Sequence, residues 1–364
     1  MIKEEFVSQL ERGATQAAAL PVTSAVLRWT ADQLKRGDPP WWKAIAKAWD
    51  KRVFVAWTEA WGLYLTALHF EALNDAECPL VKVFPSCGGT AEADPTTALA
   101  RFLADPPPSF FDNLRVRHRR TFVAPRSVLW MSPAMMFFQT RGLPYYVVET
   151  NAGAGLDLAA DVLYKNAAVD PKSKKKVFDS TLIAARIGLD PQPLDVSDIV
   201  QRRWLTAGIW PDNLEAINQL DFAIEGVLKR GKEEAAFIQL APCPPEKAAA
   251  FVAKNIPADD PDVGLLLLNM GTTVRMTDAE YAAYSAAIAS TLKSWGDRGL
   301  WMEVETVRGE TYATTYQVRV HRVVEGVLRS FVMASFDLET AKHVYSEASP
   351  TFLAVKTAKT AKTA

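Results

Sequence analysis

The spacing of apolar residues changes near residue 145. Before it, apolar side chains recur every three or four residues, as at Val26, Leu27 and Leu34, and Pro39-Pro40 interrupts the pattern. This period places them on one helix face, so residues 1 to about 75 are predicted to form a helical layer. After residue 145, short apolar runs alternate with helix-like segments, which is typical of a parallel sheet.

Five short apolar runs are the predicted parallel strands, and two longer alternating runs around Glu325-Gly326 predict an antiparallel hairpin. The fold class is therefore α/β: a Rossmann-like sheet of the class I methyltransferase type, with parallel strands closed by an antiparallel hairpin, behind an N-terminal helical layer. The predicted parallel strands are 145–148, 185–189, 236–240, 263–268 and 300–304, the hairpin strands are 314–320 and 327–336, and the helices between them are 156–164, 204–220 and 278–295.

The same patterns divide the chain into three predicted regions. Residues 1–110 form the helical N-terminal region, and residues 111–350 form the Rossmann-like domain. Residues 351–364 end in Lys-Thr-Ala repeats without a core pattern, which predicts a tail.

Composition narrows the class of partner. A formal net charge of −1 argues against a protein that binds nucleic acid mainly through phosphate contacts. Three cysteines without a C-x-x-C pair argue against a zinc site or a disulfide framework and favour the cytoplasm. No apolar run approaches the ~20 residues of a membrane span. The expected partner is a small-molecule or protein substrate, and the sequence leaves the oligomeric state open.

Tryptophan is concentrated near the start of the chain. Six of the eleven tryptophans precede residue 62, and Trp42 and Trp49 share a helix face. They form either an aromatic substrate pocket or a packed helical layer, and the layer is favoured because buried aromatic side chains dominate core energetics.

The most informative segment is 145–158, where an apolar strand ends in Glu149 and a small-residue loop follows. A dinucleotide-binding turn needs G-x-G-x-x-G, and here Gly153 and Gly155 are followed by Leu158 at the third position. A methyltransferase turn has an acid at the strand end followed by E-x-G-x-G-x-G spacing. Glu149, Gly153 and Gly155 fit it, and Asn151 replaces the first glycine. Asparagine tolerates positive φ well, so the turn geometry is expected to survive.

S-adenosylmethionine explains these residue types. Glycines let the backbone pass close to its methionine moiety, and Glu149 can accept hydrogen bonds from its ammonium group. A second acid at the end of the next strand should hold the ribose hydroxyls, and Asp190 is the candidate. The other interpretation of Asp190 is a turn-forming residue before Pro191. An insertion containing the lysine run 172–176 would explain the long spacing between loop and acid.

Residues 149–157, ETNAGAGLD, resemble the E-x-G-A-S-A-G-L-N signature of the bacterial family called domain of unknown function 2332 (DUF2332). Four further segments are similar to family motifs in the same order, at 84–89, 126–127, 188–195 and 204–212. The resemblance implies a Rossmann-like, methyltransferase-type fold over roughly residues 20–340, and it implies no substrate. The chain departs from the family at Asn151 and at 120–123, where a polar stretch has become largely apolar.

Methyl transfer needs in-line positioning and in some cases a base, so catalytic residues leave little trace in sequence. The candidates on the substrate side are Arg126, Asp195, Asp212 and His118; the other interpretation of His118 is a surface histidine. His321, within an alternating run, is expected to be structural. Neither a G-x-S-x-G nor an H-E-x-x-H motif is present, so the sequence gives no support for a hydrolase or metalloprotease.

Three functions are compatible with these patterns. The first is an S-adenosylmethionine-dependent methyltransferase-like protein that acts on a small molecule or a protein. The second is a non-catalytic Rossmann-like protein for binding or assembly. The third is an NAD-dependent enzyme, which the missing third glycine disfavours.

Overall fold

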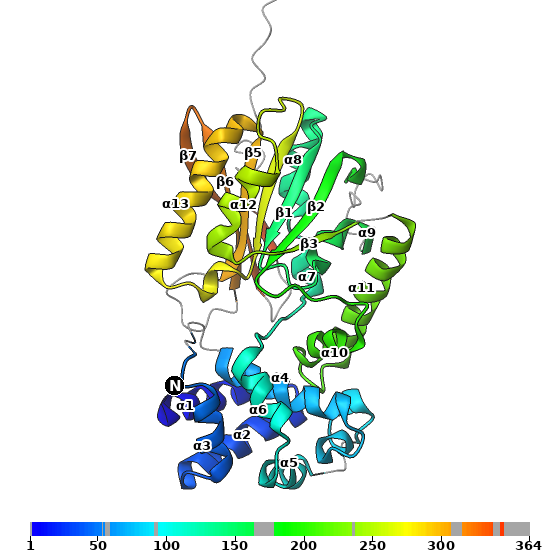
Figure 1. Cartoon of the computed structure of the whole chain (residues 1–364), viewed down its shortest axis with the longest axis vertical. Helices are drawn as coiled ribbons and strands as arrows, with labels where there is room; N and C mark the ends of the chain where they lie inside the picture. Colours follow the sequence, from blue (N-terminus) through cyan, green and yellow to red (C-terminus); the bar gives the residue numbers. More distant parts are fainter. Residues whose placement is uncertain are drawn as a thin grey trace, which may run out of the picture. The chain divides into compact units, whose positions relative to one another are not determined.

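The computed structural model (Figure 1) describes residues 2–52, 54, 59–90, 94–163, 178–234, 237–306, 315–337 and 343–345. The predicted tail 351–364 and the lysine run 172–176 lie outside these residues. The chain divides into two compact units. Unit 1 comprises residues 1–124 and 194–225, and unit 2 comprises residues 125–193 and 226–364. Residues 194–225 thus join the helical unit, although the sequence grouped them with the sheet.

Unit 1 is built from helices around one apolar core. Trp42, Trp49 and Trp61 are buried in it, and Phe6 stacks on Trp42 with ring centroids 5.4 Å apart. These tryptophans therefore belong to a packed layer, as favoured from the sequence. The helices of unit 1 are α1 (Lys3–Gln16), α2 (Pro21–Arg36), α3 (Pro40–Ala48), α4 (Glu59–Asn74), α5 (Pro95–Ala104), α6 (Pro108–Val116) and α10 (Ile199–Ala207), with the first part of α11 (Leu214–Glu233).

The single helix predicted over 204–220 is wrong. α10 ends at Ala207 and α11 begins at Leu214, and Pro211 lies in the break between them rather than in a first helical turn. A Cβ on Gly208 would lie 2.0 Å from the carbonyl oxygen of Arg120, so only glycine permits this close approach. Proline also disfavours helical geometry in the residue before it.

The described strands of unit 2 form one mixed sheet in the order β3-β2-β1-β4-β5-β6-β7-β8. Most of these strands are labelled in Figure 1. The first five strands are parallel, and β6, β7 and β8 continue the sheet antiparallel. The strands are β1 (Tyr145–Thr150), β2 (Ile183–Asp190), β3 (Gln239–Pro242), β4 (Gly264–Met270), β5 (Gly299–Thr306), β6 (Thr315–Val324), β7 (Val327–Asp337) and β8 (His343–Tyr345).

Helices cover both faces of this sheet, so the α/β class with a mostly parallel sheet is confirmed. One apolar core includes side chains of α8 (Met131–Phe137), and the other includes side chains of α12 (Ala248–Asn255) and α13 (Asp278–Trp295). Every residue of β4 is buried, as its continuous apolar run predicted. The hairpin turn at Glu325-Gly326 is also confirmed, with φ of 50° and 76°.

The strand order places a topological switch point between β1 and β4. From β1 the chain moves outward through β2 and β3, and it then returns to β4 on the other side of β1. Open α/β sheets bind ligands outside the carboxyl ends of the two strands that flank such a point. The loop after β1 and the loop after β4 therefore frame the candidate site.

Candidate functional site

The loop after β1 has three residues in the left-handed region. Asn151, Gly153 and Gly155 have φ of 60°, 59° and 70°. The expected positive φ at Asn151 is thus confirmed, and asparagine is among the side chains that tolerate this conformation. A Cβ on Gly155 would lie 2.8 Å from the Ile238 side chain, so this glycine also permits packing against the segment that leads into β3.

Asp190 lies at the end of β2, as predicted, and its carboxylate holds the loop. Its Oδ2 accepts a hydrogen bond from the Gly153 N–H at 2.8 Å, and its Oδ1 accepts one from the Gln192 N–H at 2.8 Å. The Ala152 N–H donates to the Leu189 carbonyl, which adds a backbone link between loop and strand. Asp190 is fully buried. With these hydrogen bonds, Asp190 stabilises the turn after β1. Its predicted role in binding the ribose stays a prediction.

Glu149, Asp157 and Arg126 form a buried acid–arginine cluster at the switch point. Asp157 follows the loop, in the 3-10 turn Leu156–Ala159, and Arg126 comes from the short helix α7 (Ala124–Ser127). The Arg126 Nη2 lies 3.5 Å from the Asp157 Oδ2, and the Glu149 and Asp157 carboxyl groups are close enough for each to affect the pKa of the other. A Cβ on Gly271, directly after β4, would lie 3.0 Å from the Arg126 guanidinium. Arg126 therefore reaches the ends of both strands that flank the switch point.

Burial governs the charge of this cluster. It raises the pKa of Glu149 well above its ordinary range, and the neighbouring Asp157 carboxylate raises it further. Burial also raises the pKa of Asp157, and the Arg126 charge opposes that rise. Burial thus favours the neutral form of both carboxyl groups, most strongly for Glu149, whereas the Arg126 charge favours the charged form of Asp157.

The cluster contains polar atoms without partners. Glu149 Oε2, Asp157 Oδ1 and Arg126 Nε are buried and have no hydrogen-bond partner within the part of the chain that the structure describes. On the other face of the sheet, Asn269 Nδ2 at the end of β4 is also buried and has no hydrogen-bond partner among the described residues. Buried polar groups in native proteins are usually satisfied by protein, water or ligand. Both flanks of the switch point thus have hydrogen-bonding capacity that the described residues leave unused.

The Asn269 amide is held by two donors. Its Oδ1 accepts from the Tyr284 hydroxyl at 3.0 Å and from Trp301 Nε1 at 3.3 Å. These two bonds fix the Asn269 amide, whose Nδ2 has no hydrogen-bond partner among the described residues. Thr150, the last residue of β1, is linked to the same network because its hydroxyl lies 3.2 Å from the Tyr284 hydroxyl.

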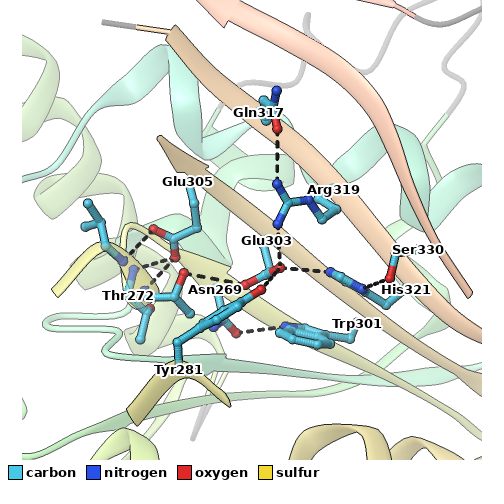
Figure 2. Close-up of polar contacts among 12 residues, drawn as sticks. Asn269, Thr272, Tyr281, Trp301, Glu303, Glu305, Gln317, Arg319, His321 and Ser330 are labelled. Atoms are coloured by element: carbon cyan, nitrogen blue, oxygen red, sulfur yellow. Dashed lines mark hydrogen bonds and ion pairs between the residues drawn. The ribbon is translucent and has the colours of Figure 1, made fainter. Parts of the chain in front are cut away.

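A second group of buried polar side chains lies on β5 and β6 (Figure 2). Glu303 Oε2 lies 2.8 Å from His321 Nε2, 3.2 Å from the Tyr281 hydroxyl and 3.8 Å from Arg319 Nη1. Glu305 accepts hydrogen bonds from the backbone N–H groups of Thr272, Thr273 and Val274. Burial raises the pKa of Glu305 to about 7, although these three bonds oppose the rise. His321 thus has the packed position expected of a structural residue, together with a charged partner.

The other predicted catalytic residues belong to unit 1, whereas Arg126 belongs to unit 2. Asp195 is exposed and accepts two hydrogen bonds from Ser197 in a local turn. His118 is exposed, with its Nδ1 3.4 Å from Arg52. Asp212 accepts bonds from the backbone N–H groups of Val22 and Thr23 at the start of α2. Their catalytic roles stay predictions, and the contacts of Asp212 are those of a helix cap.

Asp212→Ala is expected to lower the free energy of unfolding by about 1–2 kcal/mol, because α2 loses the side chain that caps its first turn. Urea denaturation measures this loss. Asp195→Ala is the matched control and should change stability by less than about 0.5 kcal/mol. Equal losses in the two variants would contradict the capping role.

Several groups of the site were not predicted from sequence. Asp157, Asn269, Glu303 and Glu305 were not among the candidates. A usable signal existed in β5, where acids alternate with Met302 and Val304 in a run that is otherwise apolar. No cluster of three metal-binding side chains occurs among the described residues, and none of the helices described there has the length and apolarity to cross a bilayer.

The fold and this edge of the sheet define an α/β protein with a polar, partly unsatisfied switch point. The chain belongs to the family described as "Uncharacterized protein conserved in bacteria (DUF2332)", whose model matches residues 7–339. The family membership expected from the loop signature is thus confirmed. No curated protein matches the chain.

Proposed function

We propose that this protein binds S-adenosylmethionine at the switch point of its sheet and acts as a methyltransferase-like protein on a small molecule or a protein. The observation that carries the proposal is the acid–arginine cluster of Glu149, Asp157 and Arg126 beside the left-handed loop. It lies where open α/β sheets bind their ligands.

The chemistry of the cluster fits the amino-acid end of this cofactor. That end carries an ammonium and a carboxylate, and the cluster offers carboxyl groups and a guanidinium side by side. The buried unpartnered atoms Glu149 Oε2 and Arg126 Nε are an acceptor and a donor for those two charges. The bound cofactor would supply the methyl group, and the chain would hold its charged end, orient it and exclude water.

The same cluster disfavours an NAD-dependent enzyme. A dinucleotide would bring its anionic pyrophosphate to the loop after β1. There it would meet two buried carboxyl groups against one guanidinium. Leu158, at the position of the third dinucleotide-type glycine, is fully buried in the core.

A non-catalytic Rossmann-like protein for binding or assembly is the second candidate, and one observation favours it. Arg126 already neutralises Asp157, and both carboxylate oxygens of Asp190 hold backbone N–H groups. If the protein is non-catalytic, the cluster serves to stabilise the edge of the sheet and binds no cofactor.

Replacement of Gly153 by alanine is expected to weaken binding of S-adenosylhomocysteine at least about tenfold, because a Cβ obstructs close approach to the loop backbone. Isothermal titration calorimetry measures the affinity. Gly142→Ala is the matched control, because Gly142 has φ of 61° and open space around its Cβ position, so both variants carry similar backbone strain.

The titration separates the candidates. Binding to the wild type and to Gly142→Ala, with loss in Gly153→Ala, supports the proposal. Binding of NAD without binding of S-adenosylhomocysteine would overturn it in favour of a dinucleotide enzyme. Heat from neither ligand with the wild type favours the non-catalytic candidate.

A further inference from the structure

The antiparallel part of the sheet contains a chain of three hydrogen-bonded side chains that the proposed cofactor site does not use. Ser330 Oγ on β7 lies 2.7 Å from His321 Nδ1 on β6, and His321 Nε2 lies 2.8 Å from Glu303 Oε2 on β5 (Figure 2). A nucleophile, a base and an acid that orients the base are thus assembled in one line.

The hydrogen-bond pattern defines the protonation of the ring. A carboxylate only accepts, so the proton of neutral His321 lies on Nε2 and points to Glu303. Nδ1 then carries the lone pair and accepts the hydrogen bond of the Ser330 hydroxyl. This is the arrangement of a serine activated by a neighbouring base.

The surroundings hold the base and the acid rigidly. His321 stacks on Trp301 with ring centroids 4.1 Å apart, and Glu303 also contacts Tyr281 and Arg319. His321 and Glu303 are buried, with 4% and 2% of their surface exposed, whereas Ser330 is exposed. Ser330 is thus exposed as a residue while its base is desolvated behind it, and all three residues lie on strands, which position side chains better than loops.

We propose that Ser330, His321 and Glu303 form a second catalytic site, which hydrolyses carboxylic esters with short apolar acyl groups. The Ser330 oxygen attacks the ester carbonyl carbon as its proton passes to His321 Nδ1, and Glu303 pairs with the resulting imidazolium. The bond to the alcohol then breaks, and the alcohol leaves with that proton. Water attacks the acyl-serine in the same way, which releases the acid and restores Ser330.

The neighbours of Ser330 indicate the substrate class. Leu328 and Val332 are two positions away on the same face of β7, and Val332 is 39% exposed, so an apolar acyl group would pack beside the hydroxyl. Arg319 pairs with Val332 across the strands and is partly exposed, which makes it the cation for a developing oxyanion.

Active-site labelling tests this proposal on the full-length protein. Diisopropyl fluorophosphate is expected to modify Ser330, which mass spectrometry of the peptides would locate, and the protein should hydrolyse p-nitrophenyl acetate. Ser330→Ala should abolish both signals, and His321→Gln should reduce the rate of labelling at least about 100-fold. Ser335→Ala is the matched control, because Ser335 lies on the same strand opposite Gln317.

Absence of an adduct on Ser330 in the wild type, while trypsin is modified in the same reagent, would overturn the proposal. Unchanged hydrolysis by Ser330→Ala would do so as well, and this variant changes only an exposed side chain. The result is independent of the cofactor proposal, because Gly153→Ala should be labelled as fast as the wild type.

Discussion

Arg126→Met is expected to lower the free energy of unfolding by about 3–5 kcal/mol, the usual cost of removing one partner of a buried ion pair. Arg126 is 5% exposed, and its guanidinium is the charge that Asp157 faces. Methionine fills much of the volume, so the loss comes mainly from the acid left buried without a cation. Chemical denaturation of the purified variant measures it.

Two further variants make this result specific. Arg126→Met combined with Asp157→Asn should recover part of the loss, because no unpaired charge then remains at the switch point. Arg115→Met is the control for loss of an arginine, since Arg115 forms an exposed pair with Asp112, and it should cost less than about 1 kcal/mol. A loss below about 1 kcal/mol in Arg126→Met would show that the cluster is not the electrostatic unit described.

The second large effect is the contribution of Glu305, which lowers stability as the pH rises from about 4.5 to about 7, whereas His69, whose pKa burial lowers to about 4, contributes in the opposite direction. Glu305 has a pKa of about 7 in the folded chain, because burial disfavours its charged form. Between its ordinary pKa and that value, the folded state binds more protons than the unfolded state, so the free energy of unfolding falls with rising pH. The difference corresponds to about 3 kcal/mol from this residue. Glu149 acts in the same direction, since its pKa is also raised.

Urea unfolding at pH 5, 6, 7 and 8 measures this dependence. Glu305→Gln should remove the part of the curve that falls with pH, because glutamine does not titrate, although it also disturbs the bonds from Thr272, Thr273 and Val274. Glu246→Gln is the control on an exposed acid and should leave the curve unchanged. A difference in stability between the wild type and Glu305→Gln that stays constant over this interval would contradict the pKa assigned to Glu305.

The strands β1 and β4 could be predicted because each is a compact apolar run bounded by turn residues, whereas β3 (Gln239–Pro242) shares only residues 239–240 with the predicted strand 236–240. The run 263–268, for example, overlaps β4 (Gly264–Met270) at residues 264–268, and the helix predicted over 278–295 coincides with α13. The helix over 204–220 failed because the break depends on the close approach of Gly208 to Arg120, a tertiary contact that spacing does not reveal. β8 was missed because it has only three residues.

The candidate site, like the fold, could be predicted from the sequence only in part. Glu149, Asn151, Gly153 and Gly155 could be found because they are adjacent in sequence and their spacing reflects one turn. The pairing of Arg126 with Asp157, and of His321 with Glu303 and Ser330, depends on which strands are neighbours and in what register. Periodicity shows which residues share a face of a strand, but it does not show which strands are neighbours. These groups could therefore be recognised only from the three-dimensional structure.

The central claim is that S-adenosylmethionine binds at the switch point of the sheet. Hydrogen–deuterium exchange with and without S-adenosylhomocysteine tests it most directly, because exchange reports both whether the ligand binds and which residues it protects. The account predicts slower exchange in peptides that cover 145–158 and in the peptide that contains Gly271, with little change in α1 to α6. Exchange that is identical with and without the ligand at saturating concentration, or protection confined to residues outside the switch point, would contradict it.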